Sequence, residues 1–364
     1  MPTPPTLDDL RRYAVARSLF KPTTLPRAIA RLGFVQADPI RAPARAQDLT
    51  LRHRVAGYTA GELERRYPRL AVEEDFFVNY GFLPREHLGL MHPRTARTAW
   101  PAARTKQAHE VLAFVREHGA VHPREVDAHF AHGKTRNWFG GSSNASTQLL
   151  DEMHYRGLLR VARRDGGVRV YAPADTRDAP QGQAEIDARL DALVDLAVAK
   201  YAPLPNPTLG MLVSRVGIGT PQWRAERARM LARAKARLAR LKIDGVDWFW
   251  PAGENPRAKR HAVPERVHLL APFDPVVWDR PRFEHFWGWA YRFEAYTPAP
   301  KRQLGYYALP LLWRDQVIGW ANAAVAGGAL RLDCGYVAGR APRDPLYRRA
   351  LDEEHARLAS FLGL

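Results

Sequence analysis

Apolar residues recur at helical spacing near the start of the chain. Residues 7–20 follow this pattern and stop before Lys21-Pro22, where the proline disfavours helical backbone. A second helix is predicted between Pro26, a residue suited to a first helical turn, and Gly33, which can end a helix. Residues 34–40 look extended. The N-terminal region is therefore predicted to be mainly helical, with one short extended segment.

Residues 102–173 show a different order of elements. One helix is predicted at residues 111–118, before Gly119, and a short one opens at His122-Pro123. A third, capped by Ser143, carries Leu149, Leu150 and Met153. Two alternating segments then flank Asp165-Gly166, a strong hairpin signal. Three helices followed by a hairpin are typical of a winged helix, a relative of the helix-turn-helix.

The second half of the chain begins after a polar linker at residues 174–183. A strongly basic helix is predicted over residues 222–241, followed by a hairpin at Asp244-Gly245. Beyond residue 264 the pattern becomes alternating, and strands are predicted at 267–270, 287–296, 303–312, 316–325 and 329–336, before a helix at 344–362.

These elements predict an α+β fold of tandem winged-helix domains, three in number, with a small antiparallel β-barrel-like domain at the C-terminus. We expect an N-terminal helical or winged-helix domain at 1–101, a winged helix at 102–178, a third winged-helix-like domain at 179–264, and the β domain with its terminal helix at 265–364.

The charge of the chain points to a polyanionic partner. Lys and Arg total 55 against 38 Asp and Glu, which gives a formal net charge of +17 and a pI near 10.3. Most of the cations are arginines, whose guanidinium groups match phosphate oxygens two at a time. A GC-rich genome would explain arginine in place of lysine, but not the positive surplus. Nucleic acid is therefore the expected partner.

Membrane insertion and secretion are not indicated. The longest mostly apolar stretch, residues 320–330, is far shorter than the ~20 residues of a membrane span. The first residues lack the features of a secretory signal, and the single Cys334 excludes an internal disulfide. We expect a cytoplasmic, nucleoid-associated protein that does not bind membranes, and a monomer because no heptad pattern indicates a dimer helix.

Standard catalytic motifs are absent from the sequence. There is no phosphate loop, dinucleotide fingerprint, zinc-protease motif or nucleophile elbow. The 13 histidines are scattered without carboxylates at ligand spacing. We therefore expect neither a metal nor a cofactor.

One short segment suggests chemistry. In an extended chain Gln36 and Asp38 would project on one face, with Val35 and Ala37 toward the core. An amide and a carboxylate can together hold a water: the amide orients it and the carboxylate accepts its proton. The alternative is that Asp38-Pro39 simply begins a turn.

Basic residues follow this segment at once, and we predict that Arg41, Arg45, Arg52 and Arg54 contact DNA phosphates. The alternative is that some of them pair with acids such as Asp48 or Glu62. In the predicted winged helix, Asn144 and Thr147 are candidates for base contacts and Arg163 and Arg164 for phosphate contacts by the wing.

Three blocks of residues resemble the YcaQ-like winged-helix superfamily of bacterial DNA glycosylases, the AlkX/AlkZ group. The blocks are Gln36-x-Asp38-x-Ile40 with Arg45 and Leu49; Pro272-Phe273-Asp274-Pro275 with Trp278-Asp279-Arg280 and Arg282; and Tyr296-x-Pro298-x-x-Lys301-Arg302-x-x-Gly305-Tyr306-Tyr307-x-Leu309-Pro310. The Gln-x-Asp form is similar to the AlkX branch.

The resemblance implies tandem winged helices and a C-terminal β-barrel around a concave DNA-binding surface. It implies excision of N-alkylated bases, N7-alkylguanines above all, with unhooking of interstrand crosslinks. By the resemblance Gln36 and Asp38 are the catalytic pair, and Lys301 and Arg302 join the predicted DNA contacts. The family block FEYWxHxAS corresponds here to residues 75–84, which lack its Trp and His.

Two functions without catalysis remain open at this point. A winged-helix transcription regulator would bind one operator site tightly and release no base. A structural DNA-damage binder would bind alkylated duplex, and its Asp38→Asn variant would behave like the parent protein.

Overall fold

The computed structural model describes residues 4–131, 133–136 and 142–364, which form two compact units. The first unit is built from the segments that end at Leu63, run from Asp195 to Leu212, and run from Leu231 to the C-terminus. The second unit comprises Glu64–Val194 and Val213–Met230. The four boundaries along the chain fall inside helices α4 (Glu62–Arg66), α9 (Gln183–Tyr201), α10 (Asn206–Val216) and α11 (Arg227–Arg237). The four domain limits expected from the sequence stay a prediction.

The N-terminal helices of the first unit are as predicted. Helix α1 (Leu7–Ser18) begins at a capping box formed by Thr6 and Asp9. Helix α2 (Leu25–Leu32) has Pro26 in its first turn and ends at Gly33, whose φ of 66° is cheap only for glycine. Strand β1 (Val35–Gln36) and helix α3 (Ala46–Leu51) follow.

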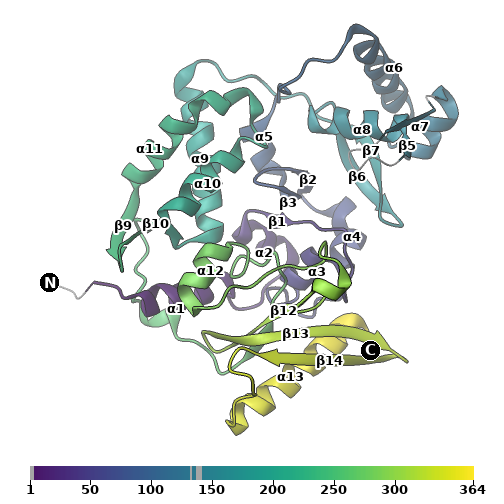
Figure 1. Cartoon of the computed structure of the whole chain (residues 1–364). Helices are drawn as coiled ribbons and strands as arrows, with labels where there is room; N and C mark the ends of the chain where they lie inside the picture. The colour runs from purple at the N-terminus through teal and green to yellow at the C-terminus, as the bar shows by residue number, and fades with distance from the viewer. Residues whose placement is uncertain (1–3, 132, 137–141) are drawn as a thin grey trace. The chain divides into compact units, whose positions relative to one another are not determined.

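The C-terminal part of the first unit contains an open four-stranded antiparallel sheet (Figure 1). Its strands are β11 (Val267–Leu269), β12 (Leu309–Trp313), β13 (Gln316–Ala326) and β14 (Ala329–Tyr336), in that spatial order. Helix α13 (Pro345–Leu362) packs along β11 and β14. No closed barrel forms among the described strands, so the barrel-like expectation is corrected to an open sheet.

The strands expected at residues 287–296 and 303–312 do not form over those ranges. Residues 280–287 form helix α12 (Arg280–Trp287), because Asp279 caps its first turn and Gly288 ends it at φ 63°. Residues 289–308 are mostly irregular, with one short helix at Ala299–Lys301, and strand β12 starts only at Leu309. The core under this region includes Val15 of α1, Val276, Phe283, Tyr291 and Leu312.

A second, three-stranded sheet of the first unit has the order β8-β10-β9. It comprises β8 (Leu204–Pro205), β9 (Leu238–Ile243) and β10 (Val246–Pro251). The predicted hairpin at Asp244-Gly245 is confirmed, since Val246 pairs with Ile243. The basic helix is shorter than predicted: α11 ends at Arg237, and Leu238 already belongs to a strand.

The second unit contains the predicted series of helices and a hairpin. Helices α6 (Ala102–His118), α7 (Pro123–Phe130) and α8 (Ala145–Tyr155) precede the hairpin β6 (Leu159–Asp165) and β7 (Val168–Pro173), which packs beside α6, α7 and α8 (Figure 1). The N-cap of α8 is Asn144 rather than Ser143. This order is that of a winged helix; the number of winged helices in the chain stays a prediction.

The remaining elements of this unit are short. They are β2 (Val72–Phe76), β3 (Tyr80–Pro84), β4 (Lys134–Arg136), β5 (Ser142–Asn144), α5 (Leu88–Met91), and 3-10 turns at Tyr67–Arg69, Arg85–His87 and Pro221–Glu226. The chain also has helix α4 (Glu62–Arg66) and a 3-10 turn at Lys259–His261. Among the described residues no helix is long and apolar enough to cross a membrane.

Candidate catalytic and DNA-binding sites

The Gln36–Asp38 segment is held from both ends by local structure. Gly33 turns the chain out of α2, and β1 then carries Gln36. On the far side, the Asp38 backbone N–H donates to the Gln47 side-chain oxygen of α3 at 3.3 Å. The segment is therefore fixed by a helix end before it and by a buried side chain after it.

Asp38 begins a turn and still retains acceptor capacity. Its Oδ1 accepts the backbone N–H of Ile40 at 2.9 Å, which is the turn geometry that Asp-Pro favours. No hydrogen bond to Oδ2 is recorded within the described part of the chain. Burial raises the pKa of the Asp38 carboxyl above its ordinary value, although the Ile40 N–H acts in the opposite sense. The Asp38 Oδ1 atom thus serves the turn, as the alternative prediction stated, whereas Oδ2 can still accept a hydrogen bond from a substrate or a water.

Gln36 is more buried than the alternating pattern predicts. Val35 and Gln36 are both buried, whereas Ala37 and Asp38 are only partly buried. The expectation that Ala37 faces the core while Gln36 faces outward is therefore wrong. The Gln36 Oε1 atom is buried and has no hydrogen-bond partner among the described residues, and such an atom is costly to leave unsatisfied.

Two buried cations of the same unit, Lys200 and Arg54, are each bonded to backbone oxygens. The Lys200 ammonium donates to the backbone oxygen of Phe34, and burial lowers the pKa of Lys200 to about 7. Arg54 forms a two-point pair with Asp274 at 2.8 and 3.0 Å and also donates to the Ser18 carbonyl at 2.8 Å. Asp274 lies in the second sequence block, so that block contributes a buried ion pair to the first unit.

Two predicted DNA contacts are corrected by their burial. Arg54 is 0% exposed and its guanidinium is used up by Asp274 and backbone oxygens. The Arg52 side chain is 4% exposed and donates to Glu354 and to the Leu269 carbonyl at 3.0 Å. Both arginines therefore stabilise the fold and cannot contact phosphates. For Arg52 and Arg54 the alternative prediction, pairing with acids of the same protein, is correct, and the acids lie far along the chain.

The other predicted DNA contacts of the first unit are nearer to solvent. Arg41 and Lys301 are exposed, and Arg45 is partly buried. Arg302 is also partly buried; it donates to the Thr297 carbonyl at 2.8 Å and lies over the Tyr306 ring at 5.0 Å. Arg41 and Lys301 are thus the freest candidates for phosphate contacts here.

In the second unit, the residues predicted to contact DNA also differ in how exposed their side chains are. The Arg164 side chain is 14% exposed and pairs with Glu74 at 2.6 Å, so it is the less accessible of the two wing arginines, and its contact with DNA stays a prediction. Arg163 is 45% exposed and pairs with Asp165 at the hairpin tip. Asn144 is exposed and donates to Asp127 at 3.1 Å, and Thr147 is partly buried.

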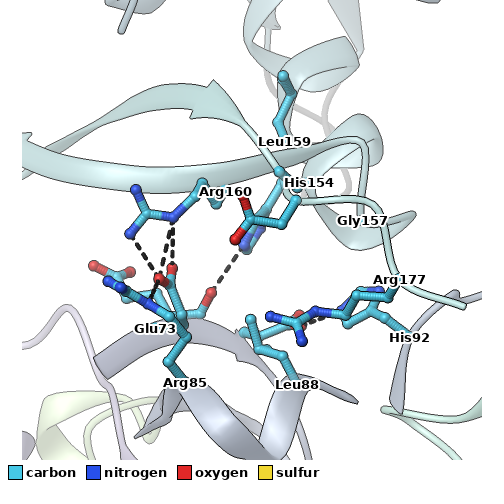
Figure 2. A pocket seen from close by; sticks show the side chains of 13 residues that line it. Glu73, Arg85, Leu88, His92, His154, Gly157, Leu159, Arg160 and Arg177 are labelled. Atoms are coloured by element: carbon cyan, nitrogen blue, oxygen red, sulfur yellow. Dashed lines mark hydrogen bonds and ion pairs between the residues drawn. The ribbon is translucent and has the colours of Figure 1, made fainter. Parts of the chain in front are cut away.

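Strand β2 carries three consecutive buried acids, each neutralised inside the second unit. Glu73 accepts from Arg85 at 2.7 Å and Arg160 at 2.6 Å, as Figure 2 shows. Glu74 pairs with Arg164, while Asp75 bonds to His92 at 2.7 Å and Arg94 at 3.0 Å. Burial raises the pKa of Asp75, but Arg94 and His92 outweigh it and hold that pKa well below its usual range.

The cavity beside these acids, shown in Figure 2, measures about 30 Å³. That volume admits about one or two waters and no base. Of the three acids, only Asp75 belongs to residues 75–84, the segment that corresponds to the FEYWxHxAS block. We therefore assign this cluster to the stability of the unit and not to catalysis.

A larger cavity of the second unit has arginines on its wall and measures about 330 Å³. Arg97, Arg224 and Arg227 line it together with Tyr155 and Trp223, and no acid is among its lining residues. The basic stretch in the sequence indicated two of these arginines, but only the fold joins them to Arg97. No group of three or more His, Cys, Asp or Glu placed for a metal is found in the described ranges.

Comparison with known proteins identifies the class of protein. The family described as "DNA glycosylase AlkZ-like" matches residues 29–361, so the chain belongs to the AlkZ-like DNA glycosylase family and is a DNA repair glycosylase. Among solved structures, the chain is similar to the DNA glycosylase AlkZ of Streptomyces sahachiroi, with a TM-score of 0.64 and 15% sequence identity. That match covers 100% of this chain and 98% of the other, and at this identity it shows a shared fold.

Proposed function

We propose that this glycosylase hydrolyses the N-glycosidic bond of cationic N-alkylated purines in duplex DNA, N7-alkylguanine above all, with Gln36 and Asp38 as its catalytic pair. The observation that carries the proposal is the partly buried Asp38, which has one oxygen fixed by Ile40 and the other without a recorded partner in the described chain. A carboxylate held in this way can both stabilise positive charge on a sugar and accept a proton from water.

An N7-alkylated guanine suits a site of this kind because it already carries a positive charge. Its departure needs no strong general acid, and the site must instead stabilise an oxocarbenium-like sugar and place a water. Asp38 supplies the charge and takes the proton of the water, and the Gln36 amide holds that water. The reaction leaves an abasic site.

Water, and not an amine, is the proposed nucleophile. Lys200 bonds to the chain two residues before Gln36, but it is 4% exposed and its ammonium is engaged by the Phe34 carbonyl. We therefore expect no Schiff base, and borohydride should trap no covalent complex with DNA. Unhooking of interstrand crosslinks extends the proposal, because an N7-linked crosslink presents the same cationic leaving group.

The test is single-turnover excision from a duplex that carries one N7-methylguanine, followed by alkaline strand scission. Asp38→Asn should slow excision about 30-fold to several hundred-fold, which corresponds to roughly 2–4 kcal/mol of barrier. Gln36→Ala should slow it less. Asp352→Asn is the matched control, since it removes the same charge from an exposed helix position. If the wild-type protein releases no more base than spontaneous depurination does, the proposed substrate is refuted. If Asp38→Asn and Gln36→Ala excise the base as fast as the wild type, the proposed site is refuted.

A further inference from the structure

One cavity of the second unit has three arginines on its wall and no acid. Arg97, Arg224 and Arg227 line this arginine cavity, which measures about 330 Å³. All three are exposed, and none of them has an ion pair or a side-chain hydrogen bond within the described ranges of the chain. Cavities of about 300–1,000 Å³ are large enough to bind small ligands. The arginine cavity therefore offers room and positive charge together.

Acids are available on neighbouring elements, but they pair with a different arginine. Arg229 of α11 pairs with Glu226 at 2.5 Å and with Asp187 at 2.8 Å. Arg224 precedes Arg227, the first residue of α11, by three positions, so their like charges lie about one helical turn apart. Like charges at this spacing destabilise a helical segment. An anion bound in the arginine cavity would offset this repulsion, which no ion pair among the described residues does.

Hydrogen bonds fix the segments that carry these arginines to one another. Arg94, three residues before Arg97, donates to the Gly219 carbonyl at 2.7 Å. The Gln222 amide donates to the Met91 carbonyl at 3.0 Å. A Cβ atom at Gly219 would lie 2.8 Å from a backbone oxygen of strand β2, so only glycine permits this close approach. The backbone around the cavity is thus preformed, which lowers the entropic cost of binding a ligand.

The wall of the arginine cavity also has an apolar and aromatic part. Val213, Ile218, Trp223 and Met230 line it beside Tyr155. The Tyr155 hydroxyl donates to the Ile218 carbonyl at 3.0 Å, so its ring is fixed in place. A sugar–phosphate unit of DNA combines an anion with the apolar face of a deoxyribose. Such a unit matches both parts of the wall.

We propose that the arginine cavity binds a phosphate group and that the backbone of the DNA duplex supplies it. The guanidinium groups of Arg97, Arg224 and Arg227 hold the phosphate oxygens, and the attached sugar packs on the apolar part of the wall. A contact of this kind carries no sequence information and fixes the position of the duplex on the second unit. The inference does not depend on the proposed lesion or on the roles of Gln36 and Asp38.

Binding of a short, undamaged duplex, measured by fluorescence anisotropy over a series of salt concentrations, tests the inference. Arg227→Gln should reduce the salt slope by about one unit and weaken binding roughly fivefold to tenfold at about 0.1 M salt. Arg97→Gln and Arg224→Gln should act in the same direction. Arg227→Lys keeps the charge, so it should keep most of the slope.

Arg229→Gln is the matched control, because it removes the same charge from the same helix. Its arginine is 43% exposed but already paired with two acids, so the slope should stay near that of the wild type. The three cavity arginines lack ion pairs among the described residues, and their glutamine variants should therefore melt no lower than Arg229→Gln does. A lower melting temperature would show that these arginines serve the fold and would overturn the inference.

Thermal unfolding with about 1 mM inorganic phosphate or deoxyguanosine monophosphate, at matched ionic strength, distinguishes the two sources of a phosphate. We expect no shift with either, because a single phosphate lacks the many simultaneous contacts of a duplex. A shift that Arg227→Gln abolishes, together with an unchanged salt slope for the duplex, would assign the cavity to a free phosphorylated ligand and overturn the DNA contact. Unchanged slopes in all three glutamine variants, or an equal loss in Arg229→Gln, would overturn it as well. None of these outcomes bears on excision, since the duplex carries no lesion.

Discussion

The Arg54–Asp274 pair provides a sharp test of whether an arginine predicted to contact DNA serves the fold or the DNA. Both side chains are 0% exposed and share two hydrogen bonds of 2.8 and 3.0 Å. Asp274→Asn keeps the shape of the acid and leaves the arginine charged, buried and unpaired. Losing one partner of a buried pair costs about 3–5 kcal/mol, a large share of the ~5–15 kcal/mol that stabilises a typical domain.

Urea unfolding followed by tryptophan fluorescence measures this loss. The midpoint should fall clearly at an unchanged m-value. The matched control is Arg240–Asp247, a pair of the same residue types at 2.9 Å whose arginine side chain is 61% exposed. Asp247→Asn should cost about 0–1 kcal/mol, because solvent screens an exposed pair. Equal losses at the two aspartates, or an Asp274→Asn variant of wild-type stability with weakened DNA binding, would refute the assignment of Arg54 to the fold.

Further predictions concern pH and salt. Folding lowers the pKa of Lys200 from 10.5 to about 7, so the unfolded chain binds more protons than the folded chain between these pH values. The free energy of unfolding should therefore rise with pH from about 7 to 10.5. Lys200→Met should flatten this rise. The pKa of His268 is lowered by burial to about 4 from 6.5, so stability should be lost as the pH falls from 6.5 toward 4; a His268→Gln variant that keeps the full acid loss would contradict this. Arg41→Ala and Arg163→Ala should each weaken DNA binding uniformly across sequences and reduce the salt slope by about one unit, whereas an unchanged slope would exclude a phosphate contact. Excision should slow as the pH approaches the raised pKa of Asp38 from above, and a pH-rate profile that is flat on its acid side would argue against a carboxylate base.

Local patterns were sufficient for the elements that are stabilised by their own residues. Helix α2 follows from Pro26 and Gly33, and the β6–β7 hairpin follows from Asp165-Gly166, because turns and caps depend on residues a few positions apart. The Asp38 turn has the same origin, since its oxygen bonds to Ile40 only two residues away. The Gln-x-Asp segment could accordingly be singled out from the sequence.

Residues 289–308 show where local patterns fail. Their alternation resembles strands, yet the backbone N–H groups of Gln303, Leu304 and Gly305 bond to one carboxylate, that of Glu294, and to no neighbouring strand. The course of this segment therefore depends on Glu294 and on Asn322 of β13, whose amide donates to the Leu304 carbonyl at 2.8 Å, and neither contact could be read from spacing.

The sequence by itself determined the positive charge of this glycosylase, most of its helices and hairpins, and the presence of an amide and a carboxylate two residues apart. Only the tertiary structure decided which of the arginines predicted to contact DNA are held in buried ion pairs. Arg54 is bonded to an acid 220 positions away and Arg52 to one 302 positions away. The physical reason is that desolvation makes an unpaired charge costly wherever it is buried, and burial depends on distant residues that no local pattern describes.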